Sequence, residues 1–154
     1  LKKWLQIMET YEGGGHAYHT TLPTDALARL HATMLETEAY GFDRVRQEQI
    51  ALGQAVRALV ERHGFASVAA EGFKAPGVVV SHTTDAEVQS SKAFLALGLQ
   101  TAAGVPLQCD EGPDFKTFRL GLFGLDKWHD VPATVARLEV ALRQVAPLQE
   151  ARAA

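Results

Sequence analysis

One arginine, Arg119, lies inside a run of residues that are otherwise apolar, small or weakly polar. The run reads Thr117-Phe118-Arg119-Leu120-Gly121-Leu122-Phe123-Gly124 and holds no acidic side chain. A guanidinium keeps its positive charge at any working pH, so a buried one needs an anionic partner. Its planar set of donors matches a carboxylate through two parallel hydrogen bonds. The pattern indicates a carboxylate-binding arginine, or alternatively an edge-strand arginine that reaches solvent or one paired with a core Asp or Glu.

A second polar segment lies near the start of the chain. In Tyr18-His19-Thr20-Thr21-Leu22-Pro23-Thr24, five of the seven side chains carry a hydroxyl or an imidazole. Three consecutive glycines, Gly13-Gly14-Gly15, cannot sustain the helix before it, and Pro23 keeps Leu22 away from helical angles. We therefore expect an extended polar loop at residues 16–23, between two helices.

Together the two segments resemble those of the class V aminotransferases, the pyridoxal-phosphate (PLP) enzymes that include alanine–glyoxylate and serine–pyruvate aminotransferases. That family carries a Tyr-His-x-Thr-x-Pro segment before a long helix and an Arg-Ile-Gly-Leu-type strand close to the C-terminus. Here the two read Tyr18-His19-Thr20-Thr21-Leu22-Pro23 and Arg119-Leu120-Gly121-Leu122-Phe123-Gly124. Their separation, and the order of helices and strands between them, also resemble the family, from about residue 1 to about residue 145.

The resemblance implies a role for three residues. Tyr18 and Thr21 would hold the cofactor phosphate, reaching in from the neighbouring subunit of a homodimer, and both hydroxyls can donate to phosphate oxygens. Arg119 would grip the α-carboxylate of the amino donor and of the oxo-acid acceptor. The structural alternative is that Tyr18 packs on the next helix and Thr21 makes a turn bond. His19 matches the family pattern but is given no catalytic role.

The resemblance also implies what is missing, because a transaminase needs a lysine that forms a Schiff base with PLP. In the family that lysine lies upstream, and none of the six lysines here is at a strand end followed by a small-residue loop: Lys2, Lys3, Lys74, Lys92, Lys116 and Lys127. We therefore expect the C-terminal portion of an enzyme that moves an amino group between a small amino acid and a 2-oxo acid such as glyoxylate or pyruvate, inactive by itself. The alternative is a stand-alone α+β domain, regulatory or for assembly, that binds a carboxylate metabolite.

The elements that must position Arg119 are short strands and longer helices. The pattern predicts strands at 67–70, 77–81, 105–109 and 117–123, and helices at 43–63, 84–97 and from 130 onward; Thr84 to Glu87 matches a capping box. This order favours an α+β fold, with a small, mostly antiparallel sheet of about four strands and helices on one face. The resemblance makes residues 1–41 the end of a large cofactor-binding domain and residues 42–154 the small domain.

Composition argues against several other classes of function. The net charge is −3 and no basic cluster is longer than Lys2-Lys3, so nucleic acid is not an expected partner. No apolar run approaches the ~20 residues that span a bilayer, and the histidines show no metal-ligand spacing. Cys109 is the single cysteine, which favours a reducing, cytoplasmic setting, and we expect it to be a small buried residue in a strand.

Overall fold

The computed structural model describes residues 1–18 and 21–146, and the chain divides into two compact units. The first is Leu1–Ala39 and the second is Tyr40–Ala154. His19 and Thr20 of the predicted polar loop lie outside the described residues. The assignment of residues 1–41 to a larger domain stays a prediction.

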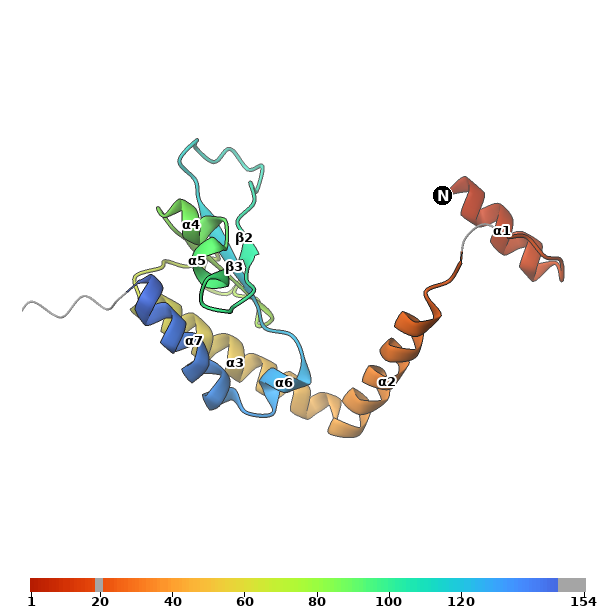
Figure 1. Cartoon of the computed structure of the whole chain (residues 1–154), viewed down its shortest axis with the longest axis horizontal. Coiled ribbons are helices and arrows are strands. Elements are labelled where there is room, and N and C mark those ends of the chain that lie inside the picture. The colour runs from red at the N-terminus through yellow and green to blue at the C-terminus, as the bar shows by residue number, and fades with distance from the viewer. Residues whose placement is uncertain (19–20, 147–154) are drawn as a thin grey trace, which may run out of the picture. The chain divides into compact units, whose positions relative to one another are not determined.

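The first unit holds α1 (Lys2–Glu12) and nearly all of α2 (Thr24–Tyr40) (Figure 1). The predicted glycines end α1, and Gly14 there has a φ of 77°, which favours glycine. α1 buries Ile7, whereas α2 has no buried residue. The apolar side chains of α2 are therefore exposed: Leu27, Leu30, Met34 and Leu35.

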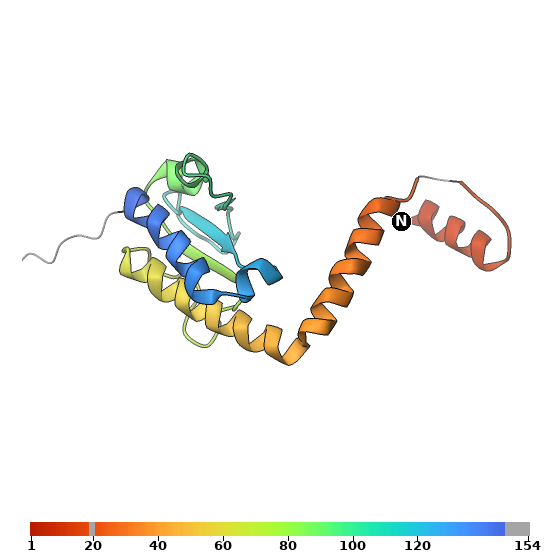
Figure 2. The same cartoon turned by 60° about the horizontal axis from the view of Figure 1, so that its bottom comes forward.

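The second unit is built on a three-stranded antiparallel sheet in the order β1-β3-β2. Its strands are β1 (Val78–His82), β2 (Ala102–Ala103) and β3 (Thr117–Gly121). Two long helices, α3 (Phe42–Arg62) and α7 (Val131–Val145), pack against each other and beside the sheet (Figure 2). Three short helices complete the unit: α4 (Ala86–Gln89), α5 (Lys92–Leu95) and α6 (Leu125–Trp128).

The core of this unit lies between the helices and one face of the sheet. Phe118 of β3 is fully buried, with its ring 5.0 Å from that of Phe65 and 5.5 Å from that of Phe94 of α5. α3 and α7 supply further fully buried side chains: Leu52, Val56, Leu59, Val60 and Leu142. The predicted α+β fold, with helices packed on an antiparallel sheet, is confirmed, but the sheet has three strands and not four.

The predicted strand at 105–109 is wrong, because that segment is an irregular part of the long β2–β3 connection. The Glu111 carboxylate accepts hydrogen bonds from the backbone N–H groups of all three residues 107–109. Gln108 has a φ of 59°, far from strand geometry. The N–H groups that a strand would offer to a neighbour are thus bound by a side chain, and Cys109, expected to be buried, is exposed.

This loop gives a prediction about pH. Hydrogen bonds from the N–H groups of Cys109 and Gln108 lower the pKa of Glu111 from 4.5 to about 2. A carboxyl with a lowered folded-state pKa stabilises the fold fully above its ordinary pKa, and that contribution is lost as the pH falls toward 2. In an NMR titration we expect the Cys109 amide shift to change with a midpoint near pH 2, and Glu111→Gln to abolish the change. A midpoint near 4.5 would contradict the hydrogen-bonded loop.

The predicted helix at 84–97 is divided into α4 and α5. Ser91 lies between them with a φ of 66°, which a continuous helix cannot contain. The cap is Asp85 and not Thr84, since the Asp85 carboxylate accepts from the N–H groups of Glu87 and Val88. The capping-box pattern therefore located the start of the helix within one residue but not its end.

Candidate functional site

Arg119 lies in the middle of β3, the central strand. Its direct partners across the two strand pairs are Val80 of β1 and Ala102 of β2. Paired residues in an antiparallel sheet project to the same face, so small apolar side chains flank the arginine on both sides. Phe118 and Leu120, its neighbours along the strand, are buried in the core. Arg119 therefore stands on the opposite face of the sheet, away from that core.

Arg119 is half-buried as a residue, and one hydrogen bond within the sheet orients its guanidinium. Its Nε donates to the backbone carbonyl of Ala103 at 3.0 Å. Among residues 1–18 and 21–146, no Asp or Glu forms an ion pair with it, and Nη1 and Nη2 donate to no other group. Arg119 is not on an edge strand, because β3 is central, but its side chain does reach the open face of the sheet. In the described part of the chain, the charge of Arg119 has no carboxylate from the protein itself.

Tyr18 and Thr21 are brought together in the first unit. The Tyr18 hydroxyl and the Thr21 Oγ1 are 3.1 Å apart, and both side chains are exposed. Tyr18 also lines an apolar groove of about 550 Å³ beside Trp4, Met8 and Tyr11 of α1. Two adjacent hydroxyls in solvent can both turn an O–H toward an anion without leaving a buried group unsatisfied, so this donor pair fits a phosphate.

Comparison with solved structures gives information on the fold. No protein-family model and no curated protein matches the chain. Among solved structures, the chain is similar to the crystal structure of an alanine–glyoxylate aminotransferase from Nostoc sp., with a TM-score of 0.68 and 19% sequence identity. The chain has an aminotransferase-like fold. The match covers 92% of this chain and 36% of that one, so the chain spans about a third of that protein's length. At this identity the likeness concerns the fold alone.

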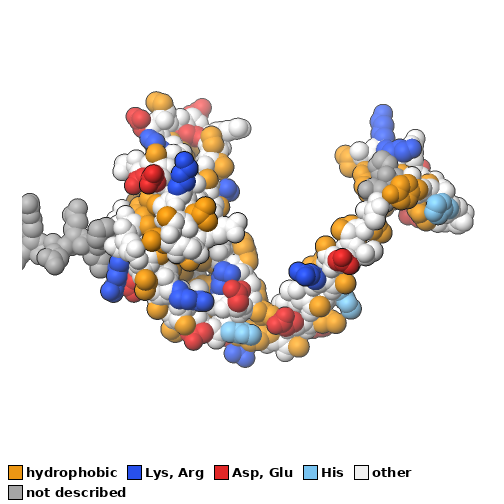
Figure 3. Space-filling view, viewed as in Figure 1, with side chains coloured by type: hydrophobic (Ala, Val, Ile, Leu, Met, Phe, Trp, Pro, Cys, Tyr) orange, Lys and Arg blue, Asp and Glu red, His pale blue; other side chains and the backbone are white. Residues whose placement is uncertain are grey.

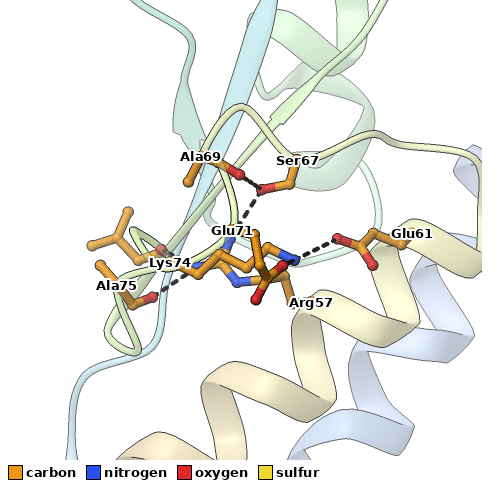
Figure 4. A network of polar contacts seen from close by, with 8 residues as sticks. Arg57, Glu61, Ser67, Ala69, Glu71, Lys74 and Ala75 are labelled. Carbon is orange, nitrogen blue, oxygen red and sulfur yellow. Dashed lines mark hydrogen bonds and ion pairs between the residues drawn. The ribbon is translucent and has the colours of Figure 1, made fainter.

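A buried arginine, Arg57 of α3, was not predicted from the sequence (Figure 4). It is 6% exposed, and its Nη2 donates to the carbonyls of Ala75 and Val78 at 2.7 and 3.2 Å. Its Nη1 donates to the Ser67 hydroxyl at 3.3 Å. Val78 is the first residue of β1, the strand that pairs with β3. Arg57 therefore holds the start of β1 in place beside the strand that carries Arg119. The sequence signal was a charged residue within the apolar stripe of α3.

Charged side chains near Arg57 neutralise one another. The Lys74 ammonium lies 2.9 Å from Glu71 and 3.8 Å from Glu61 (Figure 4). The hydrogen bond between Lys74 and Glu71 lowers the pKa of the carboxyl and raises the pKa of the ammonium. Since these groups already satisfy each other, we regard the network as structural. Arg119 differs because its one hydrogen bond in the described part of the chain is to the backbone carbonyl of Ala103.

Three observations on the described residues concern other kinds of site. Within them, no group of three or more His, Cys, Asp or Glu side chains could hold a metal ion. No helix in the described ranges is long and apolar enough to cross a membrane. On the face of the second unit seen in Figure 3, acidic and basic side chains are interspersed. That face therefore has no basic stripe of the kind that binds nucleic acid.

Proposed function

We propose that this chain is the C-terminal portion of a PLP-dependent class V aminotransferase, homodimeric when whole. The enzyme moves an amino group between a small amino acid and a 2-oxo acid such as glyoxylate or pyruvate. The observation that carries the proposal is the guanidinium of Arg119, held on the open face of the central strand with no carboxylate from the described chain. The aminotransferase-like fold supports it.

Arg119 binds the carboxylate common to both substrates. Its Nε is already engaged by the Ala103 carbonyl, which fixes the plane of the guanidinium before substrate arrives. The two terminal nitrogens then offer parallel donors to both carboxylate oxygens. Small neighbours, Val80 and Ala102, leave the approach open and provide apolar surroundings that strengthen the charge-assisted bonds. Because every amino and oxo acid carries this carboxylate, one residue serves both half-reactions.

Tyr18 and Thr21 would hold the cofactor phosphate, each hydroxyl donating one hydrogen bond to a phosphate oxygen. When bound, PLP supplies the electron sink and carries the amino group from donor to acceptor. The lysine that anchors the cofactor is supplied by a part of the enzyme that precedes these residues. Lys74 and Lys127 are already in ion pairs, with Glu71 and with Asp126, and are not proposed for that role.

The proposal is tested on the whole protein, expressed with the coding sequence upstream of Leu1 and saturated with PLP. We expect L-alanine and glyoxylate to yield pyruvate and glycine in equal amounts, followed by a coupled assay for pyruvate. The chain of residues 1–154 alone is expected to give no turnover. A whole protein that binds carboxylic acids but neither PLP nor amino donors would instead support the stand-alone carboxylate-binding domain.

Removing the Tyr18 hydroxyl is expected to weaken PLP binding. A hydrogen bond to a charged group contributes about 1.5–3 kcal/mol, so Tyr18→Phe should raise the Kd for PLP roughly 10- to 150-fold. Thr21→Val should also raise the Kd for PLP. The Kd is measured by titrating the apo form of the whole protein with PLP and following absorbance.

Pyridoxal, which lacks the phosphate, is the matched control ligand. Its affinity should be nearly the same in the wild type and in Tyr18→Phe, because the hydroxyl has nothing to bind. Tyr11→Phe, another exposed tyrosine of the first unit, is the matched control variant. An unchanged Kd for PLP in both Tyr18→Phe and Thr21→Val would remove the phosphate role.

A further inference from the structure

A small cavity lies at the edge of the sheet where β2 begins. Because β2 has only two residues, the segment before it, residues 99–101, forms the wall of the cavity on that side. Side chains of α3, α6 and α7, together with the end of β3, supply the remainder. The volume is about 240 Å³. Pockets for drug-sized ligands usually measure about 300–1,000 Å³, so this cavity suits a smaller molecule.

The floor of the cavity is apolar. Burying the apolar surface of a ligand is favourable, so this floor fits an aliphatic chain or a ring. Arg119 does not line the cavity, and Leu120 projects to the face of the sheet opposite Arg119. The cavity is therefore separate from the carboxylate site proposed above. The aliphatic side chains that line it are those of Val56, Leu99, Leu120, Leu122 and Leu138.

The rim of the cavity carries an excess of one positive charge. Three charged side chains line it, and two of them, Asp126 and Lys127, are only 3.1 Å apart and balance each other. The third is Arg137, which is exposed and donates from Nη2 to the Thr134 Oγ1 at 3.4 Å. Within residues 1–18 and 21–146, no Asp or Glu forms an ion pair with Arg137. A ligand with a negative charge therefore complements this rim.

The wall of the cavity holds one polar atom without a partner. Thr101 lines the cavity, and its Oγ1 is enclosed and makes no hydrogen bond in the described part of the chain. An enclosed hydroxyl that lacks a partner costs free energy. A ligand with a polar group beside this wall would give the hydroxyl a partner.

We propose that this cavity is a second binding site, which takes a small carboxylate with an apolar body. The apolar body lies on the leucine floor, the carboxylate lies near Arg137, and the Thr101 hydroxyl gains a partner from the polar group of the ligand. The inference goes beyond the proposed transamination, because none of Tyr18, Thr21 and Arg119 lines the cavity.

The test uses 3-phenylpropionate as the probe. It is added to the whole protein carrying Arg119→Ala, so that the carboxylate has no site at Arg119. Calorimetric titration gives the Kd, and we expect NOEs from the ring protons of the probe to the methyl groups of Leu99 and Leu138. Since an exposed ion pair contributes little, Arg137→Ala should raise the Kd about two- to fivefold. Thr101→Val, which removes the hydroxyl at nearly constant volume, should also raise the Kd.

Two controls isolate the charge at the rim. Arg143→Ala removes an exposed arginine of the same helix that pairs with Glu139 and does not line the cavity, so the Kd should not change. 3-Phenyl-1-propanol keeps the ring but has no charge, and its Kd should be the same with and without Arg137→Ala. Added salt should weaken binding of the carboxylate and leave binding of the alcohol nearly unchanged.

Two results would overturn the second site. One is the absence of NOEs from 3-phenylpropionate to Leu99 and Leu138. The other is a Kd that is the same in Arg137→Ala and in Thr101→Val as in the parent protein. Neither result affects the proposed transamination, because the test measures binding in a protein without Arg119 and requires no turnover.

Discussion

Arg119→Ala is expected to lower kcat/KM for the amino donor and for the oxo acid by at least roughly 30-fold. The variant loses a charge-assisted, two-bond contact to the substrate carboxylate, and losing one partner of such a contact typically costs about 2–5 kcal/mol. That range corresponds to a roughly 30- to 4,000-fold fall in kcat/KM. The measurement is steady-state turnover of the whole protein with L-alanine and glyoxylate, together with a titration of PLP.

Three controls make the Arg119 result specific. Arg119→Lys keeps the charge but loses the planar pair of donors, so its kcat/KM should lie between those of the wild type and Arg119→Ala. Arg143→Ala removes an exposed arginine of α7 that pairs with Glu139 and should have no effect. The weak reactivity of ethylamine, an amine without a carboxylate, should be the same in Arg119→Ala as in the wild type. A normal kcat/KM for alanine in Arg119→Ala would refute the carboxylate role.

The place of Arg119 could be predicted because its signal is local. A lone charge in a run of apolar residues marks a strand with one unusual side chain, and β3 is observed at Thr117–Gly121. The same holds for Val78–His82, where β-branched residues form β1. What the sequence could not supply was the absence of a carboxylate beside Arg119, because that depends on residues far apart in the chain.

The errors arise where a side chain competes with regular backbone hydrogen bonds. In the predicted strand at 105–109, the Glu111 carboxylate binds three backbone N–H groups. In the predicted helix at 84–97, Ser91 adopts a left-handed conformation that propensity does not reveal. Arg57 is a third case, because its partners are carbonyls 18 and 21 residues along the chain and a hydroxyl 10 residues along. None of these hydrogen bonds produces a periodic pattern in the sequence, so periodicity could not predict them.

Phe118→Ala is expected to be the most destabilising single truncation in the sheet. The Phe118 side chain is 0% exposed and its ring packs between those of Phe65 and Phe94. Truncating a buried phenylalanine to alanine costs about 3–5 kcal/mol, because the cavity only partly collapses. A domain of this kind is stable by about 5–15 kcal/mol in total, so the variant should unfold at a much lower urea concentration than the wild type. Urea unfolding of residues 1–154, followed by circular dichroism, measures the change in the free energy of unfolding.

Phe118 and Arg119 are adjacent in sequence and face opposite sides of β3, so the two variants separate stability from binding. Phe118→Leu keeps most of the buried volume and should cost less than about 1.5 kcal/mol. Leu95→Ala, at a side chain that is 64% exposed, should change the free energy of unfolding by no more than about 0.5 kcal/mol. Arg119→Ala should unfold at nearly the wild-type urea concentration, because it loses one bond to the Ala103 carbonyl on the open face. If Arg119→Ala were instead as unstable as Phe118→Ala, its loss of turnover would report unfolding, and the arginine would be a structural residue.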